Sequence, residues 1–140
     1  MSNLAVLNEP IPSASRWSIW TGRMLSGLVI LFLVMDAGMK IAALPIVSES
    51  AVMIGWTADP GFWRAMGLLL LAITALYAWP RTAVLGAILL TGYLGGAVAT
   101  HLRMSDPLLS HTLFGVYLGI VLWSGLWLRD VRVRNLLPIG

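Results

Sequence analysis

Apolar residues gather in four long runs along the chain, and short segments between the runs hold most of the polar residues. The runs cover about residues 17–39, 60–79, 82–103 and 107–128. Each is close to the roughly 20 apolar residues that an α-helix needs to cross the hydrocarbon core of a bilayer. The pattern predicts an all-α integral membrane protein, a bundle of four membrane-spanning helices whose first partner is the lipid bilayer.

The segments between the runs predict how the spans are connected. Residues 46–56 are moderately apolar, but they are too few to cross a bilayer and are interrupted by the polar residues 48–50. A short helix at the membrane interface suits this segment, and a plain loop is the alternative. The turn from Pro80 to Thr82 is so short that spans two and three must be antiparallel neighbours.

Two Asp-Pro pairs mark the starts of spans. Asp59 precedes Pro60 at the second run, and Asp106 precedes Pro107 at the fourth. An aspartate can cap the first free amide groups of a helix, and proline fits its first turn. We therefore expect Asp59 to cap span two and Asp106 to cap span four.

The domain organisation is simple. Residues 1–16 are mixed in character and contain two prolines, so they are interpreted as a flexible cytoplasmic tail. Residues 17–138 then form a single membrane domain, because four spans and their connections use the remaining length.

Composition narrows the class of protein. Hydrophobic residues make up 59% of the 140 residues and charged residues only 11%, whereas a typical soluble domain is about 25% charged. So few charges cannot cover a compact soluble globule, which argues against an ordinary soluble enzyme. The chain has no cysteine, which excludes disulfide, iron–sulfur and thiol chemistry within it.

The net charge of +3 does not indicate nucleic-acid binding, because the basic residues border the apolar runs. Six of them share the side of the two termini and the span two–three turn: Arg16, Arg23, Arg81, Arg129, Arg132 and Arg134. Three belong to the other side: Lys40, Arg64 and Arg103. The positive-inside rule then predicts both termini in the cytoplasm. Most tryptophans lie near span ends, with Trp56 and Trp63 on the outer side, and are interpreted as an aromatic belt.

Small residues in span three predict how the helices pack. Lipid tails are as apolar as leucine, so membrane helices associate through close backbone contact and interhelical polar contacts. The small residues recur at or near helical spacing: Gly86, Gly92, Gly95, Gly96 and Ala99. We expect a packing seam here, with span three as the most buried helix; a groove for a partner helix or a lipid tail is the alternative.

Ionisable residues at the predicted outer ends of the spans form the candidate polar site. Asp36 and Lys40 lie four residues apart at the end of span one, so they share a helix face and can pair. His101 and Arg103 end span three, and His111 lies in the second turn of span four. Topology brings these groups to the extracytoplasmic end of the bundle. The alternatives are a structural ion pair, histidines satisfied at the interface, and an arginine that extends to the headgroups.

Three kinds of ligand can be considered for this cluster: a quinone, a haem and a metal ion. A quinone needs hydrogen-bond donors at its carbonyl oxygens, which His101, Arg103 or Lys40 could supply, and a groove for its tail beside the span-three glycines. Haem would need His101 and His111 as axial ligands, and their position near the membrane edge argues against it. No metal site is predicted, because no three convergent ligands can be shown.

A family resemblance covers nearly the whole chain, from about Arg16 to Pro138. It is carried by the segments Arg23 to Gly27 and Asp36 to Lys40, and above all by the span-three motif from Thr91 to Arg103. These residues resemble the DoxX-like family of small four-span membrane proteins. The resemblance implies four spans with a short extracytoplasmic helix after the first, in a bacterial plasma membrane.

The resemblance implies little about activity. The family is named for a membrane subunit associated with a thiosulfate:quinone oxidoreductase, and most of its bacterial members have no assigned activity. The leading hypothesis is a scaffold or accessory subunit of a membrane complex, without catalysis of its own. Its partners would be a membrane or extracytoplasmic protein, or a second copy of the chain. The alternatives are a quinone- or lipid-binding subunit of a membrane oxidoreductase, and a small solute or proton-coupled carrier, which four unbroken spans make less attractive.

Overall fold

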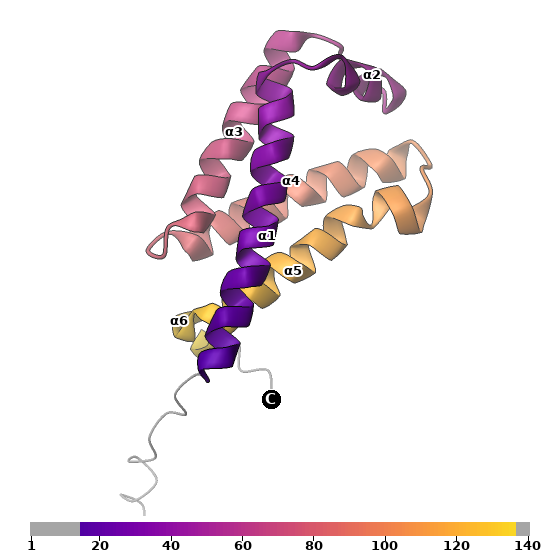
Figure 1. Ribbon diagram of the computed structural model, residues 1–140. Coiled ribbons are helices and arrows are strands. Elements are labelled where there is room, and N and C mark those ends of the chain that lie inside the picture. The colour runs from indigo at the N-terminus through magenta and orange to yellow at the C-terminus, as the bar shows by residue number, and fades with distance from the viewer. Residues whose placement is uncertain (1–14, 137–140) are drawn as a thin grey trace, which may run out of the picture.

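The computed structural model describes residues 15–136, and these form seven helical segments (Figure 1). They are α1 (Arg16–Ile41), α2 (Pro45–Met53), α3 (Pro60–Ala78), α4 (Ala83–Arg103), the π-helical turn η2 (Leu108–Thr112), α5 (Phe114–Arg129) and α6 (Val131–Leu136). The predicted tail lies outside the described residues except for its last two, and Arg16 already belongs to α1.

Within residues 15–136, four helical segments are long and apolar enough to cross a membrane: α1, α3, α4, and η2 continued by α5. This confirms the predicted all-α fold with four spans. The short helix predicted after the first span is also confirmed, as α2. Asp59 caps α3 as expected, because its Oδ2 accepts a hydrogen bond of 2.8 Å from the amide of Phe62. The fourth span differs from the prediction, since it begins as a π-helical turn and is not one unbroken α-helix.

Helices α1 and α4 lie diagonally across the bundle, and each packs against both α3 and α5. Span three, predicted to be the central and most buried helix, is therefore not central, although its apolar part is as buried as that of α3 and more buried than those of the other two spans. Along α1, Gly67 of α3 lies against Ala37 and Gly125 of α5 lies against Gly22 and Ser26, and Tyr77 of α3 also reaches Ser26. We call the end of the bundle with α2 and the α4–η2 turn the α2 end, and the opposite end the terminal end. Figure 1 shows α1 and α3 together at the α2 end, diverging there from α4 and α5.

Close backbone contacts occur at single glycines on several helices. A Cβ atom on Gly22 of α1 would lie 2.8 Å from the carbonyl oxygen of Gly125 in α5. A Cβ on Gly67 of α3 would lie 2.8 Å from the carbonyl oxygen of Ala37 in α1, and one on Gly115 would lie 2.9 Å from Val98. A side chain at Gly22 or Gly67 would therefore clash with the backbone of the neighbouring helix.

The residues of the predicted seam on span three have different surroundings in the structure. A Cβ on Gly86 would lie 2.3 Å from the backbone nitrogen of Tyr77, so α3 and α4 pack tightly there. A Cβ atom on Gly92, Gly95 or Gly96 would meet no described atom within 4 Å beyond the local helix backbone. These three glycines and Ala99 are exposed. The spacing of the small residues is helical, but this part of α4 has turned away from its neighbours.

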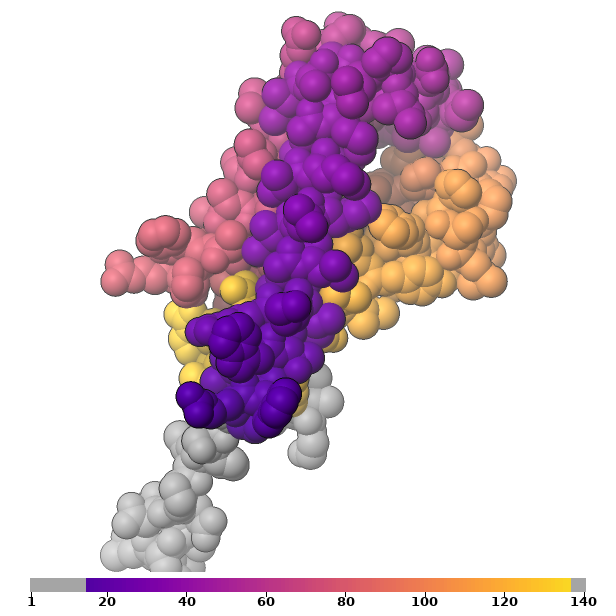
Figure 2. Space-filling model, in the orientation of Figure 1, coloured from indigo at the N-terminus to yellow at the C-terminus, as the bar shows by residue number. Residues whose placement is uncertain are grey.

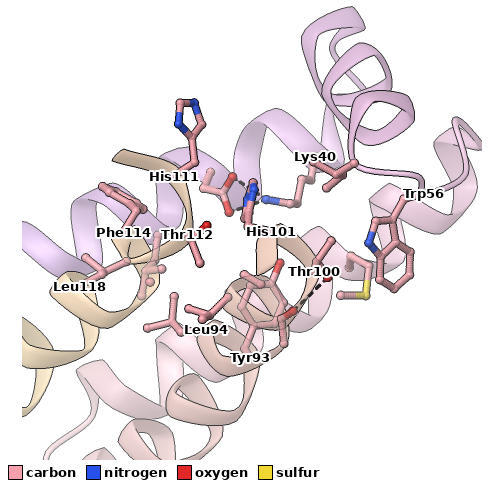
Figure 3. A pocket seen from close by; sticks show the side chains of 18 of the residues that line it. Lys40, Trp56, Tyr93, Leu94, Thr100, His101, His111, Thr112, Phe114 and Leu118 are labelled. Carbon is pink, nitrogen blue, oxygen red and sulfur yellow. Dashed lines mark hydrogen bonds and ion pairs between the residues drawn. The ribbon is translucent and has the colours of Figure 1, made fainter. Parts of the chain in front are cut away.

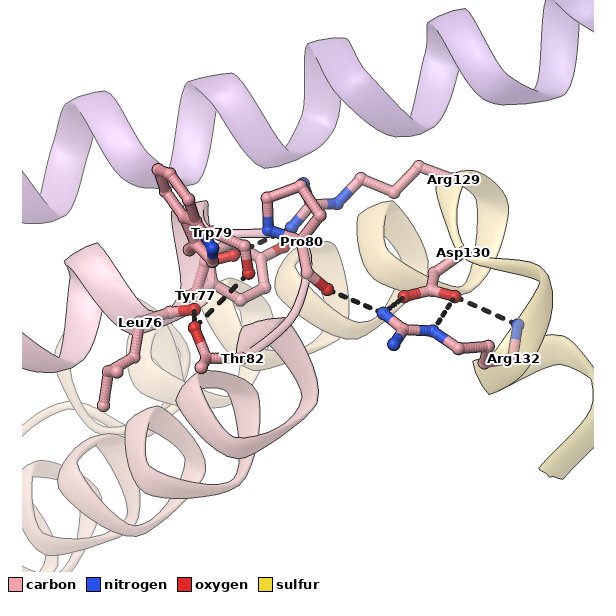
Figure 4. A network of polar contacts seen from close by, with 8 residues as sticks. All are labelled: Leu76, Tyr77, Trp79, Pro80, Thr82, Arg129, Asp130 and Arg132. Atoms are coloured by element: carbon pink, nitrogen blue, oxygen red, sulfur yellow. Dashed lines mark hydrogen bonds and ion pairs between the residues drawn. The ribbon is translucent and has the colours of Figure 1, made fainter.

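Tyr77 joins three helices in the buried centre of the terminal half. Its side chain is fully buried, and its hydroxyl lies 3.0 Å from the Ser26 hydroxyl on α1 and donates to the Leu122 carbonyl on α5 at 2.9 Å. Arg129 donates to the Tyr77 carbonyl at 3.0 Å, and its guanidinium carbon lies 5.0 Å from the ring centroid. Figure 4 shows this arginine beside Tyr77. One side chain therefore links α1, α3 and α5.

Polar contacts around the α3–α4 turn close the terminal end (Figure 4). Arg132 donates to the carbonyl of Pro80 at 2.6 Å and forms an ion pair with Asp130 at 2.8 Å. The hydrogen bond from Arg132 is the main reason why the pKa of Asp130 is below its ordinary value. Thr82 donates to the carbonyl of Leu76 at 2.8 Å. The residues just after the last span are thus tied to the turn between spans two and three.

Two alanine substitutions on α4 test the packing. Gly86→Ala should lower the free energy of unfolding by about 1–3 kcal/mol, because the added methyl group meets backbone that cannot move cheaply. Gly95→Ala, the same change on the same helix, should leave stability unchanged or raise it by up to about 1 kcal/mol through helix propensity. Unfolding in mixed detergent and SDS measures both. Equal effects would contradict the packing described.

Removal of the Tyr77 hydroxyl tests the link between α1, α3 and α5. Tyr77→Phe should lower the free energy of unfolding by about 1–2 kcal/mol, since it leaves the buried hydroxyl of Ser26 with one partner fewer. Tyr117→Phe is the matched control, because Tyr117 is 43% exposed on α5. Identical unfolding curves for the two variants would show that the Tyr77 link contributes nothing.

Candidate functional site at the open end of the bundle

A cavity of about 450 Å³ lies near the α2 end, between α1, α3, α4 and α5. Figure 2 shows a hollow on this side of the molecule, between α1 with α2 and the ends of α4 and α5. Its lining is mainly apolar, with side chains such as Phe32, Leu33, Met66, Leu94 and Leu118. Ile54 and Trp56, from the segment after α2, also line it. Binding pockets for small molecules are commonly of this size and character.

The glycines of α4 explain why this space is open. Gly92 and Gly96 line the cavity, and neither has a side chain that could fill it. Gly95 lies between them in sequence but does not line the cavity, because it faces another direction on the helix. Gly92 and Gly96 therefore fit the alternative prediction, a groove along span three, better than they fit the predicted packing seam.

Asp36 and Lys40 form the predicted ion pair in the last turns of α1. The Lys40 ammonium donates to both carboxylate oxygens of Asp36, as expected for residues four apart on one helix face. Their side chains are 27% and 14% exposed, respectively, and both line the cavity. Figure 3 shows Lys40 beside His101, at the polar end of the cavity.

His101 is bound to Asp106, which corrects the predicted role of Asp106 as a helix cap. The Nδ1 of His101 lies 2.6 Å from Oδ2 of Asp106, and the turn that starts span four has no side-chain cap. The reason is the end of α4, where Ser105 adopts a left-handed conformation with φ 58°. The amides of Ser105 and Asp106 then donate to the carbonyls of Leu102 and His101. These two hydrogen bonds form a Schellman motif, which holds Asp106 at the C-terminal end of α4.

His111 reaches the same cavity from η2. It lines the cavity, its Nδ1 lies 2.8 Å from the Ser110 hydroxyl, and its ring centroid is 6.4 Å from that of His101. Isolated π-helical turns often occur at functional sites. Thr112, the last residue of η2, is fully buried and donates to the Asp106 carbonyl at 3.2 Å.

Arg103 has a different place from the other predicted site residues. It does not line the cavity, and its guanidinium donates to the carbonyl of Ile54 at 3.2 Å. This bond ties the segment after α2 to the end of α4. Arg103 therefore fixes the part of the cavity lining that follows α2, Ile54 and Trp56, to the end of α4.

Aromatic residues of the site were not predicted from the sequence. Trp56 stacks on Phe62 with ring centroids 5.6 Å apart, and Trp63 packs edge-on against Phe62 at 5.3 Å. All three line the cavity, as does Tyr93 of α4. Trp56 and Trp63 had been interpreted only as an aromatic belt. The available signal was three aromatic residues within eight positions, beside the short helix.

Together these contacts define the chemistry of the site. Asp36, Lys40, His101 and His111 line one cavity, whereas Arg103 braces it. Within residues 15–136, no three histidine, aspartate or glutamate side chains are grouped so that they could hold a metal ion. The cavity offers an apolar volume that ends on hydrogen-bonding groups, an arrangement that suits an amphipathic molecule.

The fold and the site define a multi-pass membrane protein with four spanning helices and a cavity at one end. The chain belongs to the DoxX-like family, whose sequence model matches residues 24–125, so the predicted resemblance is confirmed. Neither a curated protein nor a solved structure shows a significant match to the chain.

Proposed function

We propose that this chain is an accessory membrane subunit that binds an amphipathic, membrane-soluble molecule of the quinone or lipid type. The observation that carries the proposal is the cavity near the α2 end, which is apolar along α1, α4 and α5 and ends on Asp36, Lys40 and His101. In this proposal the chain binds and orients its ligand and catalyses no reaction by itself. The α2 end is the extracytoplasmic end in the proposed orientation.

The lining supports a definite orientation of the ligand. The polar head would lie beside Lys40 and His101, whose ammonium and imidazole groups can hydrogen-bond to oxygen atoms. The apolar tail would lie along Gly92 and Gly96, where the absence of side chains leaves room, and against Leu118. If the ligand is a quinone, it would supply electron-carrying capacity that the protein chain lacks.

Filling the cavity provides the test. Gly96→Leu should weaken binding of a decyl-substituted benzoquinone or of dioctanoylglycerol by about tenfold or more, about 1.4 kcal/mol, because the new side chain occupies the tail position. Gly95→Leu is the matched control and should bind like the parent, since Gly95 is exposed outside the cavity. Native mass spectrometry in mild detergent would measure both. Equal binding by the two variants would refute the proposed site.

A scaffold role is the second candidate, and the exposed face of α4 favours it. Gly95 and Ala99 lie outside the cavity, exposed and one helical turn apart. Small residues at this spacing allow a second membrane helix to approach closely. In this role the chain would hold a partner protein in the membrane, whether or not the cavity is filled.

The same variant separates the two roles. Under the scaffold role, Gly95→Leu should abolish co-purification of a partner while ligand binding stays unchanged; Gly96→Leu is the comparison. Quantitative mass spectrometry of proteins extracted in mild detergent makes the measurement. If parent and Gly95→Leu chains both purify alone, the scaffold role is excluded.

A further inference from the structure

The charges around the cavity restrict the head group of its ligand. Lys40 is the one lysine or arginine among the described residues that line the cavity, and its ammonium is already shared by both oxygens of Asp36. Asp106 adds a second carboxylate through its contact with His101. Arg103 lies nearby, but it is bound to the Ile54 carbonyl and does not line the cavity. Among the described residues that line the cavity, no lysine or arginine is therefore left without an acidic partner.

An anionic head would be poorly accommodated by these groups. Sites for phosphate usually present unpaired arginine or lysine side chains, or a series of free backbone amides. Here a phosphate would approach the carboxylates of Asp36 and Asp106, and repulsion between like charges is strong in a partly desolvated site. The free-energy cost of desolvating the phosphate would not be offset, because no lysine or arginine of the described lining is free to pair with it.

An uncharged head fits the same groups. In the tautomer of His101 that carries its hydrogen on Nδ1, Asp106 accepts from that group, and Nε2 can accept from a hydroxyl group of the ligand. The Lys40 ammonium has three hydrogens, and those not used by Asp36 can be donated to a carbonyl or ether oxygen. Donor and acceptor thus belong to neighbouring lining residues. Asp106 is a positioning residue, because it acts on the ligand only through His101.

We infer that the cavity selects ligands with an uncharged, oxygen-bearing head on an apolar tail, and that it rejects the anionic headgroups of phospholipids. This inference rests on the proposed function and specifies its ligand. A quinone or quinol and a diacylglycerol share this chemistry. The ion pair between Asp36 and Lys40 sets the preference, because it cancels the charge of the one lysine among the described lining residues.

A pair of lipids with identical tails tests the inference directly. Dioctanoylglycerol should bind the full-length chain in nonionic detergent about tenfold or more tightly than dioctanoylphosphatidylglycerol, which differs by its anionic head. A decyl-substituted benzoquinone and its quinol, titrated separately, distinguish a quinone from a glyceride as the better ligand. Equal or tighter binding of the anionic lipid would overturn the inference. This comparison needs no variant.

A charge change should switch the preference. Asp36→Asn frees the Lys40 ammonium, so it should shift the ratio of anionic-lipid binding to dioctanoylglycerol binding by about tenfold towards the anionic lipid. The double variant Asp36→Asn with Lys40→Gln restores an uncharged pair and should return the parental preference. Glu49→Gln, the same loss of charge at an exposed position of α2 outside the cavity, should have no effect.

The outcomes also separate this inference from the proposed function. If Gly96→Leu reduces binding but charged and uncharged lipids bind alike, the cavity is a ligand site and the inference on its head group is wrong. If none of the lipids or quinones binds in a way that depends on Gly96, both fail. An effect of Glu49→Gln as large as that of Asp36→Asn would show that only net charge matters, and would also overturn the inference.

Discussion

The hydroxyl of Tyr77 is the contact on which the arrangement of the bundle depends. Burial of apolar surface cannot hold helices together in lipid, so close contact and interhelical hydrogen bonds must do so. Tyr77 provides both, because its hydroxyl joins Ser26 to the backbone of α5 and its own backbone packs against Gly86. These contacts lie in the terminal half of the bundle. Near the α2 end α4 has no comparable contact with α1 or α3, so the helices diverge and leave the cavity.

The spans were predictable because membrane thickness demands long apolar runs, but helix packing was not. The sequence shows which face of α4 carries small residues, and it does not show which neighbour, if any, that face meets. Gly86 packs against α3, whereas Gly92 and Gly96 open onto the cavity. The close packing of α1 against α5 had one signal, the pair Gly22 and Ser26 spaced by four residues, and both are buried. That pair is less conspicuous than the glycines of span three.

The polar site was predictable as far as topology alone could define it. Helix ends that face the same side of the membrane must lie near one another, which brings Asp36, Lys40, His101 and His111 together. The roles of Asp106 and Arg103 depend on local backbone conformation, which composition does not reveal. Ser105 has a left-handed backbone conformation, which turns Asp106 towards His101. Gly55 is also left-handed, and a Cβ atom added to it would lie 3.2 Å from the guanidinium of Arg103. A serine in that conformation is uncommon, so the sequence favoured a simple helix cap.

The cavity's apolar part is formed by residues of the membrane-spanning helices themselves, among them Phe32, Gly96 and Leu118. A ligand dissolved in the bilayer can therefore meet the site by lateral diffusion, without passing through water. Occupancy then depends on the mole fraction of the ligand among the surrounding lipids. A dissociation constant that looks weak in molar units can correspond to a nearly full site in the membrane, where such molecules are concentrated.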